Sequence, residues 1–252
     1  MKELEQCLTQ NTLEVFEKVS KLECIRDLYL CGGTAQALLM AHRKSEDLDF
    51  ELLGIQKERP GLSFDKIINE VQSIFPNARK EILGDDHFQM FVGNNVKLSF
   101  FRPQNNVPKL SVAEQYNNIK IPSLKELFGM KVFTTKVRYK FRDYYDIYCL
   151  LKEGLCLKEA VDYACKFSKY TIRSKQFYSE LLVPSLFAHD TGFELLDSKY
   201  KVTPEEIKDF IQEKIIEEES LVNSQKKEKI SQIYKELKSA GNADLKNGQS
   251  LS

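Results

Sequence analysis

Residues 30–50 of the chain read LCGGTAQALLMAHRKSEDLDF, and this stretch decides the fold. The short apolar segment 27–31 predicts a strand that ends at the Gly-Gly-Thr sequence of residues 32–34. An Ala- and Leu-rich stretch follows and predicts a helix over residues 35–41. Residues 46–53 then alternate between acidic and apolar side chains, which predicts a half-buried strand. The order of these elements places two glycines and several polar side chains at one strand end.

The turn and the acidic strand together have the residues of a phosphate and metal site. Gly32 and Gly33 let the backbone approach a ligand closely, and the helix that follows presents free N–H groups to an anion. Thr34 adds a hydroxyl at the helix start. Asp47 and Asp49 lie two residues apart on a strand, so their carboxylates share one face. Two carboxylates beside an anion site are suited to holding Mg²⁺ against a triphosphate.

Either feature alone is typical of an ordinary turn or a solvated strand face, and only their joint order favours a site. That order resembles the nucleotidyltransferase superfamily, and within it the AbiEii/AbiGii-type nucleotidyltransferase toxins, a prokaryotic toxin–antitoxin and phage-defence family. The resemblance implies that Asp47 and Asp49 bind the metal and take part in catalysis. It also implies a set of residues that bind the nucleotide phosphates: Gly32, Gly33, Thr34, Arg43 and Ser45.

A second informative stretch, residues 131–146, is basic and reads KVFTTKVRYKFRDYYD. It has no acid between its first residue and Arg142. If one helix continued through it, spacings of three and four would place five residues on one face: Lys131, Thr135, Arg138, Arg142 and Asp146. A break around residues 139–140 would weaken that expectation. The alternative is a solvated basic face on which Arg142 pairs with Asp146.

The second stretch also resembles the AbiEii pattern, which has a Lys-x-x-Thr segment and then Arg-Asp-x-x-Asp at the start of a helix. The match implies that Lys131 contacts the nucleotide and that Asp143 or Asp146 is a catalytic carboxylate, of which we favour Asp146. Asp146 could accept the proton of the attacking hydroxyl. The cations Arg138 and Arg142 would neutralise phosphate charge.

The sequence departs from many nucleotidyltransferases at one position. Those enzymes have a third carboxylate on a strand that follows the Asp-x-Asp pair. The corresponding strand, residues 96–101, has Lys97 and Ser99 on one face and no acid. Either Asp143 or Asp146 compensates, or the chain has lost catalysis and is a nucleotide-binding or interaction module.

Five aromatic residues accompany the basic ones. We expect most of them in the core and one in the pocket, where an aromatic ring can stack on a nucleobase. The five are Tyr139, Phe141, Tyr144, Tyr145 and Tyr148.

The remaining pattern predicts an α+β fold with a mixed sheet and a helical second part. A first helix is expected over the first 20 or so residues, a helix over 63–75, and strands over 79–83, 87–92 and 96–101. Ser123 and Glu126 form a capping box. Further helices are expected over 124–138, 141–152, 157–168, 173–183, 203–219 and 224–239. We predict a nucleotidyltransferase domain over 1–120, a helical domain over 121–240 and a disordered tail over 241–252.

Composition excludes several other classes of protein. The 37 basic residues balance the 37 acidic ones, which argues against a wholly basic nucleic-acid coat protein. No apolar run is long enough to cross a membrane, and the N-terminus has no apolar stretch like that of a secretory signal, so we expect the cytoplasm. The six scattered cysteines indicate reduced thiols, not a zinc site.

The residues and the resemblance together predict a Mg²⁺-dependent enzyme. It would transfer a nucleotide from an NTP to an acceptor hydroxyl and release pyrophosphate. The family suggests that the acceptor is RNA, such as a tRNA 3′ end, or a protein hydroxyl, and that a cognate antitoxin restrains the enzyme.

Overall fold

The computed structural model describes residues 2–53, 63–102, 110–167 and 173–247, with side chains described up to residue 233. The chain divides into two compact units, Met1–Ile211 and Gln212–Ser252. The first unit contains the whole sheet and every residue of the predicted site. The boundary that the sequence suggests near residue 120 lies inside this first unit, and the division into functional domains stays a prediction.

The first unit contains one seven-stranded mixed sheet in the order β3-β4-β5-β2-β1-β7-β6. Strand β1 runs parallel to β7, β2 runs parallel to β5, and the other neighbours are antiparallel. The mixed sheet confirms the predicted fold class. The strands are β1 (Tyr29–Cys31), β2 (Leu48–Glu51), β3 (Arg79–Gly84), β4 (His87–Val92), β5 (Val96–Phe101), β6 (Val112–Tyr116) and β7 (Ile119–Pro122).

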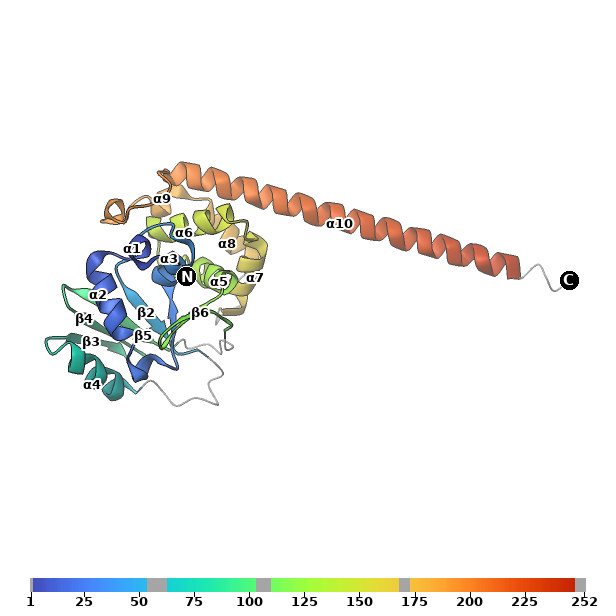
Figure 1. The fold of residues 1–252 in the computed structure, drawn as a ribbon. Helices are drawn as coiled ribbons and strands as arrows, with labels where there is room; N and C mark the ends of the chain where they lie inside the picture. The colour runs from blue at the N-terminus through green and yellow to red at the C-terminus, as the bar shows by residue number, and fades with distance from the viewer. Residues whose placement is uncertain (1, 54–62, 103–109, 168–172, 248–252) are drawn as a thin grey trace. The chain divides into compact units, whose positions relative to one another are not determined.

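Within the first unit, helices lie around the sheet (Figure 1). The helices in the middle of the chain follow the predicted ranges closely. A single turn of 3₁₀ helix also occurs at Glu23–Ile25 and at Phe193–Leu195. The α-helices are α1 (Leu4–Cys7), α2 (Gln10–Val19), α3 (Gly32–Met40), α4 (Phe64–Ile74), α5 (Leu124–Thr134), α6 (Phe141–Lys152), α7 (Leu157–Phe167), α8 (Ser174–Leu181), α9 (Pro184–Phe187) and α10 (Pro204–Asn247).

One face of the sheet forms the main core. Phe50, Phe100 and Phe88 lie side by side on three neighbouring strands, with ring centroids 5.4 and 5.0 Å apart. Phe64 of α4 covers this row at 4.5 Å from Phe88. Because side chains alternate along a strand, the residues between these aromatics face the other side of the sheet. That second face has the acidic residues of β2.

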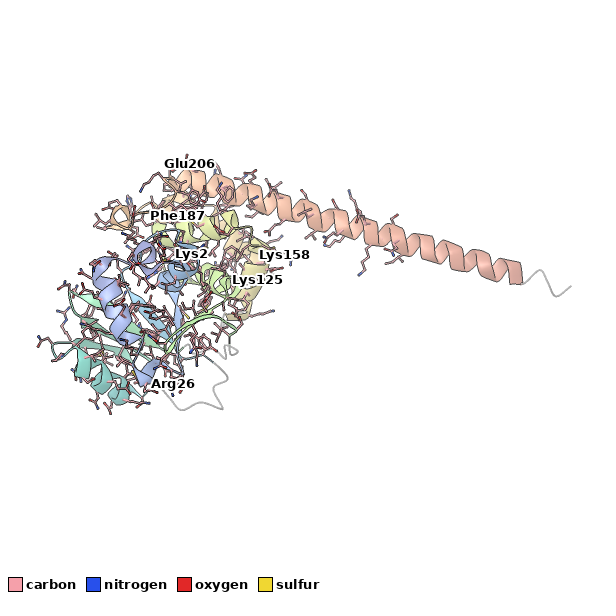
Figure 2. All side chains as sticks on the ribbon, in the orientation of Figure 1. Lys2, Arg26, Lys125, Lys158, Phe187 and Glu206 are labelled. Atoms are coloured by element: carbon pink, nitrogen blue, oxygen red, sulfur yellow. The ribbon has the colours of Figure 1, made fainter. Side chains whose placement is uncertain are left out.

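The helical part packs through close contacts between aromatic rings and small residues. Tyr144 of α6 stacks on Phe187 of α9, which is labelled in Figure 2, with ring centroids 3.7 Å apart. A Cβ on Gly129 of α5 would lie 2.2 Å from the ring of Tyr163, so only glycine lets α5 and α7 approach this closely. The capping box of Ser123 and Glu126 begins α5 as predicted.

Three helix predictions differ from the structure. The first helix is interrupted at Leu8, because the chain there forms a bridge with Ser45. Helix α5 ends at Thr134 instead of 138, so the basic stretch contains a turn. The helices predicted over 203–219 and 224–239 are one helix, α10, because no Gly or Pro separates them.

Helix α10 also continues through residues 241–247, where the sequence suggests disorder, and residues 248–252 lie outside the described part.

Strands β6 and β7 were not predicted. Each is only five or four residues long, and β7 leads directly into the cap of α5. Within the described residues, no helix is both long and apolar enough to cross a membrane.

Candidate active site

The turn between β1 and α3 is built around its two glycines. Gly32 has a φ of +68°, a left-handed conformation that favours glycine, and a Cβ there would lie 3.0 Å from Oδ2 of Asp49. A Cβ on Gly33 would lie only 2.3 Å from Nη2 of Arg43. The glycines therefore let the start of α3 lie directly against Asp49 on one side and Arg43 on the other.

The loop after α3 is fixed by buried hydrogen bonds. The Thr34 hydroxyl bonds the Ser45 hydroxyl at 2.7 Å and also contacts the carbonyl oxygen of Asp47. The Ser45 amide donates to the Cys7 carbonyl at 2.9 Å, and the Thr9 amide donates to the Ser45 carbonyl at 3.2 Å. The hydroxyls of Thr34 and Ser45, both predicted to bind phosphate, are therefore engaged in holding the loop that leads into β2.

The two predicted metal ligands lie on the second face of the sheet, where solvent reaches them. Asp49 pairs in register with Ser99 of β5 and with Cys31 of β1. Asp47, just before β2, is 35% exposed, and its Oδ2 lies 2.7 Å from Nζ of Lys97, which is 27% exposed. Ser99 thus stands beside Asp49, at the strand position where the resemblance described above leads us to expect a third carboxylate.

The donor set of this face fits Mg²⁺ better than a metal that needs an all-protein cage. The described residues include no group of three or more His, Cys, Asp or Glu side chains placed to hold a metal. Mg²⁺ is commonly held by one or two carboxylates together with water and substrate phosphates. Asp47 and Asp49 supply that number, and the close approach of Gly32 to Asp49 leaves the start of α3 beside them.

Glu51 is a third acid on the same strand face that the sequence interpretation missed. It is buried, and burial raises its pKa to about 8. The nearby Asp49 carboxylate raises the pKa as well, while a hydrogen bond with the Cys31 thiol acts in the opposite direction. The alternation of acids at positions 47, 49 and 51 was the signal that could have revealed it.

Asp146, which we favoured as the proton acceptor, is fully buried among basic groups. Its two oxygens accept hydrogen bonds from Arg43 Nε at 2.7 Å, Arg43 Nη2 at 2.9 Å and Lys131 Nζ at 2.9 Å. His42 Nε2 lies 2.8 Å from Oδ1. Although burial acts to raise it, the pKa of Asp146 lies well below its ordinary value because Arg43, Lys131 and His42 stabilise the charged form.

These contacts do not suit Asp146 to the role of a base. A base must reach the proton that it accepts and must bind that proton near the working pH. Asp146 has no access to solvent, and its charge is neutralised by buried cations. It instead joins α6 to the loop after α3 and to α5.

Asp143 makes the equivalent connection one turn earlier on α6. Its Oδ1 accepts from Lys131 Nζ at 2.9 Å, and both of its oxygens accept from the guanidinium of Arg138, at 2.9 and 3.1 Å. Asp143 and Lys131 are buried, whereas Arg138 is 46% exposed. Burial acts to lower the pKa of Arg138, but Asp143 raises it overall, with further contributions from Asp49 and Asp190. Arg138 is thus an oriented and solvent-accessible cation whose charge interacts with that of Asp49.

Arg142, the remaining cation that the sequence places in the site, does not join Lys131 and Arg138 at Asp143. Arg142 does not pair with Asp146, because its Nε donates to Asp190 at 2.7 Å and its Nη1 lies 3.6 Å from Glu46. The Asp190 carboxylate also accepts a hydrogen bond from the backbone amide of Arg142, in the first turn of α6. A residue outside the basic stretch therefore satisfies a free amide at the start of this helix. The turn between α5 and α6, and not one continuous helix face, brings Lys131 and Arg138 to Asp143.

The predicted residues therefore form two layers. The outer layer is solvent-accessible and consists of Asp47, Asp49 and Arg138, with Lys97 beside them. The inner layer is buried and holds the outer one in place. Its members are Thr34, Arg43, Ser45, Lys131, Asp143 and Asp146.

Comparison with known proteins gives a family and a fold. The family model described as nucleotidyl transferase AbiEii toxin, type IV TA system, matches residues 18–239. An uncharacterized protein of Aquifex aeolicus (strain VF5) is 29% identical over 213 residues, which cover 83% of this chain and 97% of that protein.

Two crystal structures from Helicobacter pylori share the fold. One, of a protein assigned as a nucleotidyltransferase, has a TM-score of 0.51 at 20% identity and covers 85% of this chain and 99% of its own. The other, of JHP933, has a TM-score of 0.50 at 20% identity and covers 86% of this chain and 97% of its own.

Proposed function

This chain belongs to the nucleotidyl transferase AbiEii toxin family of type IV toxin–antitoxin systems, and from that premise we propose the reaction that its site supports. The chain transfers a nucleotide from an NTP to an acceptor hydroxyl in a Mg²⁺-dependent reaction. The acceptor oxygen forms a bond to the α-phosphorus, the bond from that phosphorus to the bridging oxygen breaks, and pyrophosphate leaves. The acceptor hydroxyl loses its proton to solvent.

One observation carries the proposal. Two solvent-accessible carboxylates, Asp47 and Asp49, lie beside the start of α3, and the turn after α5 presents a solvent-accessible cation, Arg138, which both oxygens of Asp143 orient. Carboxylates alone would repel a triphosphate, and cations alone would leave no ligand for a metal. The combination suits a metal-bound polyphosphate.

Asp47 and Asp49 are the residues that would hold Mg²⁺. When bound there, Mg²⁺ would neutralise phosphate charge and polarise the reacting phosphoryl group. The free N–H groups at the start of α3 are placed to bind phosphate oxygens, because Gly32 and Gly33 present no side chain. Arg138 would stabilise the charge that develops on the leaving pyrophosphate.

The buried residues have positioning roles in this proposal. Asp143 holds the guanidinium of Arg138 through both of its oxygens, which fixes the orientation of the cation before substrate binds. Asp146 holds Arg43 beneath Gly33 and so supports the turn at the start of α3. Lys131 joins the two carboxylates and neutralises both. An arrangement set before binding costs no reorganisation during the reaction.

The acceptor and the regulation are the finer parts of the proposal. We expect RNA, including a tRNA 3′ end, or a protein hydroxyl as acceptor, and a cognate antitoxin as the partner that limits toxicity. The family supports the toxin role.

The test is incubation of the chain with each α-³²P-labelled NTP, Mg²⁺ and total cellular RNA and protein. Asp47→Ala is run beside the parent chain, with Asp65→Ala as a matched control, because Asp65 is an exposed acid on α4. We expect label on one acceptor class with the parent chain and the control, and none with Asp47→Ala. Transfer that persists in Asp47→Ala would contradict the metal assignment, and NTP binding without any transfer would contradict the reaction.

A further inference from the structure

The turn between α5 and α6 exposes an aromatic side chain beside the candidate active site. Three aromatic residues of the adjoining stretch, Tyr144, Tyr145 and Tyr148, are buried. Tyr139 differs from them, because 42% of it is exposed. The structure therefore identifies which aromatic residue of this stretch is available to a ligand.

The backbone of this turn is held in place from within the protein. Lys136 forms an ion pair with Glu180, and Arg138 is bound by both oxygens of Asp143. Between and after these anchors, Val137 and Tyr139 are left in solvent, and Val137 is 72% exposed. Exposed apolar groups on a fixed backbone lose little conformational freedom when they bind a partner.

Cations alternate with these apolar groups. Arg138 is 46% exposed and is oriented by Asp143. Lys140 is exposed and has no ion-pair partner among the residues that the structure describes. No acid occurs between residues 131 and 142, although the chain as a whole is neutral. Alternating aromatic and cationic side chains are typical of surfaces that bind single-stranded nucleic acid.

The openness of the turn favours a strand over a single nucleotide. Sites for small ligands are concave and bury most of the ligand. Val137 and Tyr139 are instead among the exposed large hydrophobic residues of the chain. An exposed surface with a ring and nearby cations suits a strand whose bases stack and whose phosphates pair with the cations.

We propose that residues 137–140 bind the acceptor, a single-stranded RNA end, with Tyr139 stacked on a base and Lys140 paired with a phosphate. This inference rests on the proposed transfer reaction and specifies its acceptor. Arg138, in the same segment, is bound by Asp143 of the buried layer and would link the acceptor strand to the candidate active site. The segment would then bring the RNA hydroxyl to the face that holds Asp47 and Asp49.

The test measures RNA binding without turnover. The full chain, in EDTA and without NTP, is titrated into a fluorescein-labelled single-stranded RNA of about 12 nucleotides, within the usual site size, and anisotropy is recorded at several salt concentrations. Tyr139→Ala, Tyr139→Phe and Lys140→Gln are compared with the parent chain. Ile216→Ala serves as the matched control, because Ile216 is an exposed apolar residue of the second unit.

We expect Tyr139→Ala to raise the Kd for RNA about tenfold or more, since base stacking on one ring has that magnitude. Tyr139→Phe keeps the ring and should keep most of the affinity. Lys140→Gln should lower the slope of log K against log salt by about 0.7, the value for one phosphate contact with a single strand. Ile216→Ala should change neither quantity.

Two results would overturn the proposal: no RNA binding by the parent chain at low salt, or equal Kd values for Tyr139→Ala and the parent. Tyr139-dependent binding without any transfer activity would contradict the proposed reaction and leave the RNA surface standing.

Discussion

Removal of the Asp146 carboxylate should destabilise the protein strongly, even though no solvent reaches this residue. Asp146→Asn removes the negative charge that Arg43 and Lys131 share with it in the buried layer. The amide keeps one acceptor oxygen but turns an N–H₂ group toward a cation. Arg43 and Lys131 would then be buried with less compensation.

The contacts set the magnitude of this effect. Asp146 takes part in four hydrogen bonds of 2.7 to 2.9 Å, of which three come from Arg43 and Lys131 and one involves His42. Breaking a buried ion pair by removing one partner costs about 3–5 kcal/mol. Because Lys131 still has Asp143 as a partner, the destabilisation by Asp146→Asn should stay within that range. Against a total stability of about 5–15 kcal/mol, the loss is large.

Urea unfolding, followed by circular dichroism in the absence of nucleotide, measures this loss. With an m-value of about 3 kcal/mol/M, the midpoint should fall by roughly 1–1.7 M. Asp49→Asn is the control, because Asp49 lies in the solvent-accessible layer and should change the midpoint by less than about 0.2 M. If Asp146→Asn left the midpoint unchanged and abolished transfer, Asp146 would be a catalytic group and the positioning role would be refuted.

The stability loss in Asp146→Asn should also depend on pH, and the pKa of Asp146 sets the direction. The pKa of Asp146 in the folded protein lies below its unfolded value, because Arg43 and Lys131 stabilise the charge. The ionised Asp146 carboxylate makes its full contribution to the free energy of unfolding above the unfolded pKa of about 3.9. This contribution is lost as pH falls through the folded pKa. The stability difference between the parent chain and Asp146→Asn should therefore shrink as pH falls below about 4.

Three further predictions concern the face that holds the metal ligands. Gly33→Ala should lower stability by about 1–3 kcal/mol in a urea titration, because the new Cβ must displace Arg43, which Asp146 holds; a gain in stability, as for glycine in an ordinary helix, would mean that Arg43 moves freely. Glu51→Gln should stabilise the apo protein in EDTA more at pH 8 than at pH 5. The folded pKa of about 8 exceeds the ordinary 4.5, so the parent chain loses stability as pH rises between those values; equal melting-temperature differences at the two pH values would count against a buried neutral Glu51. Lys97→Gln removes a cation that competes for Asp47, and the Mg²⁺ concentration for half-maximal transfer should fall roughly two- to fivefold. A rise would show that Lys97 contacts substrate instead.

The sequence predicted those parts of the fold whose signals are local. The strand, glycine turn and helix of residues 27–41 were predicted because their residues lie next to one another in the chain. The three strands between residues 79 and 101 were likewise predicted from alternation and their turns. Strands β6 and β7 form a local hairpin but were missed, because the β6 residues VAEQY do not alternate between apolar and polar side chains and β7 has only 4 residues.

The arrangement of the site was less predictable than its composition. Arg43 and Asp146 are separated by 103 positions, and no pattern along the chain indicates that they form a bidentate pair. Because the sequence does not reveal that contact, it suggests that Arg43 is an exposed phosphate ligand and that Asp146 is a base. Likewise, the partner of Arg142 is Asp190, which lies outside the stretch that carries the family resemblance.

The loop after α3 has two backbone contacts with a much later part of the chain. The Lys44 amide donates to the Leu196 carbonyl at 2.6 Å, and the Lys199 amide donates to the His42 carbonyl at 2.9 Å. During translation these bonds cannot form until residue 199 has left the ribosome, well after the carboxylates of β2 have been made. At about 5–20 residues per second, the nascent chain spends several seconds without these two contacts, after the carboxylates of β2 have been made. Until residue 199 has emerged, the loop is held only by contacts with earlier parts of the chain, such as those of Ser45 with Cys7 and Thr9.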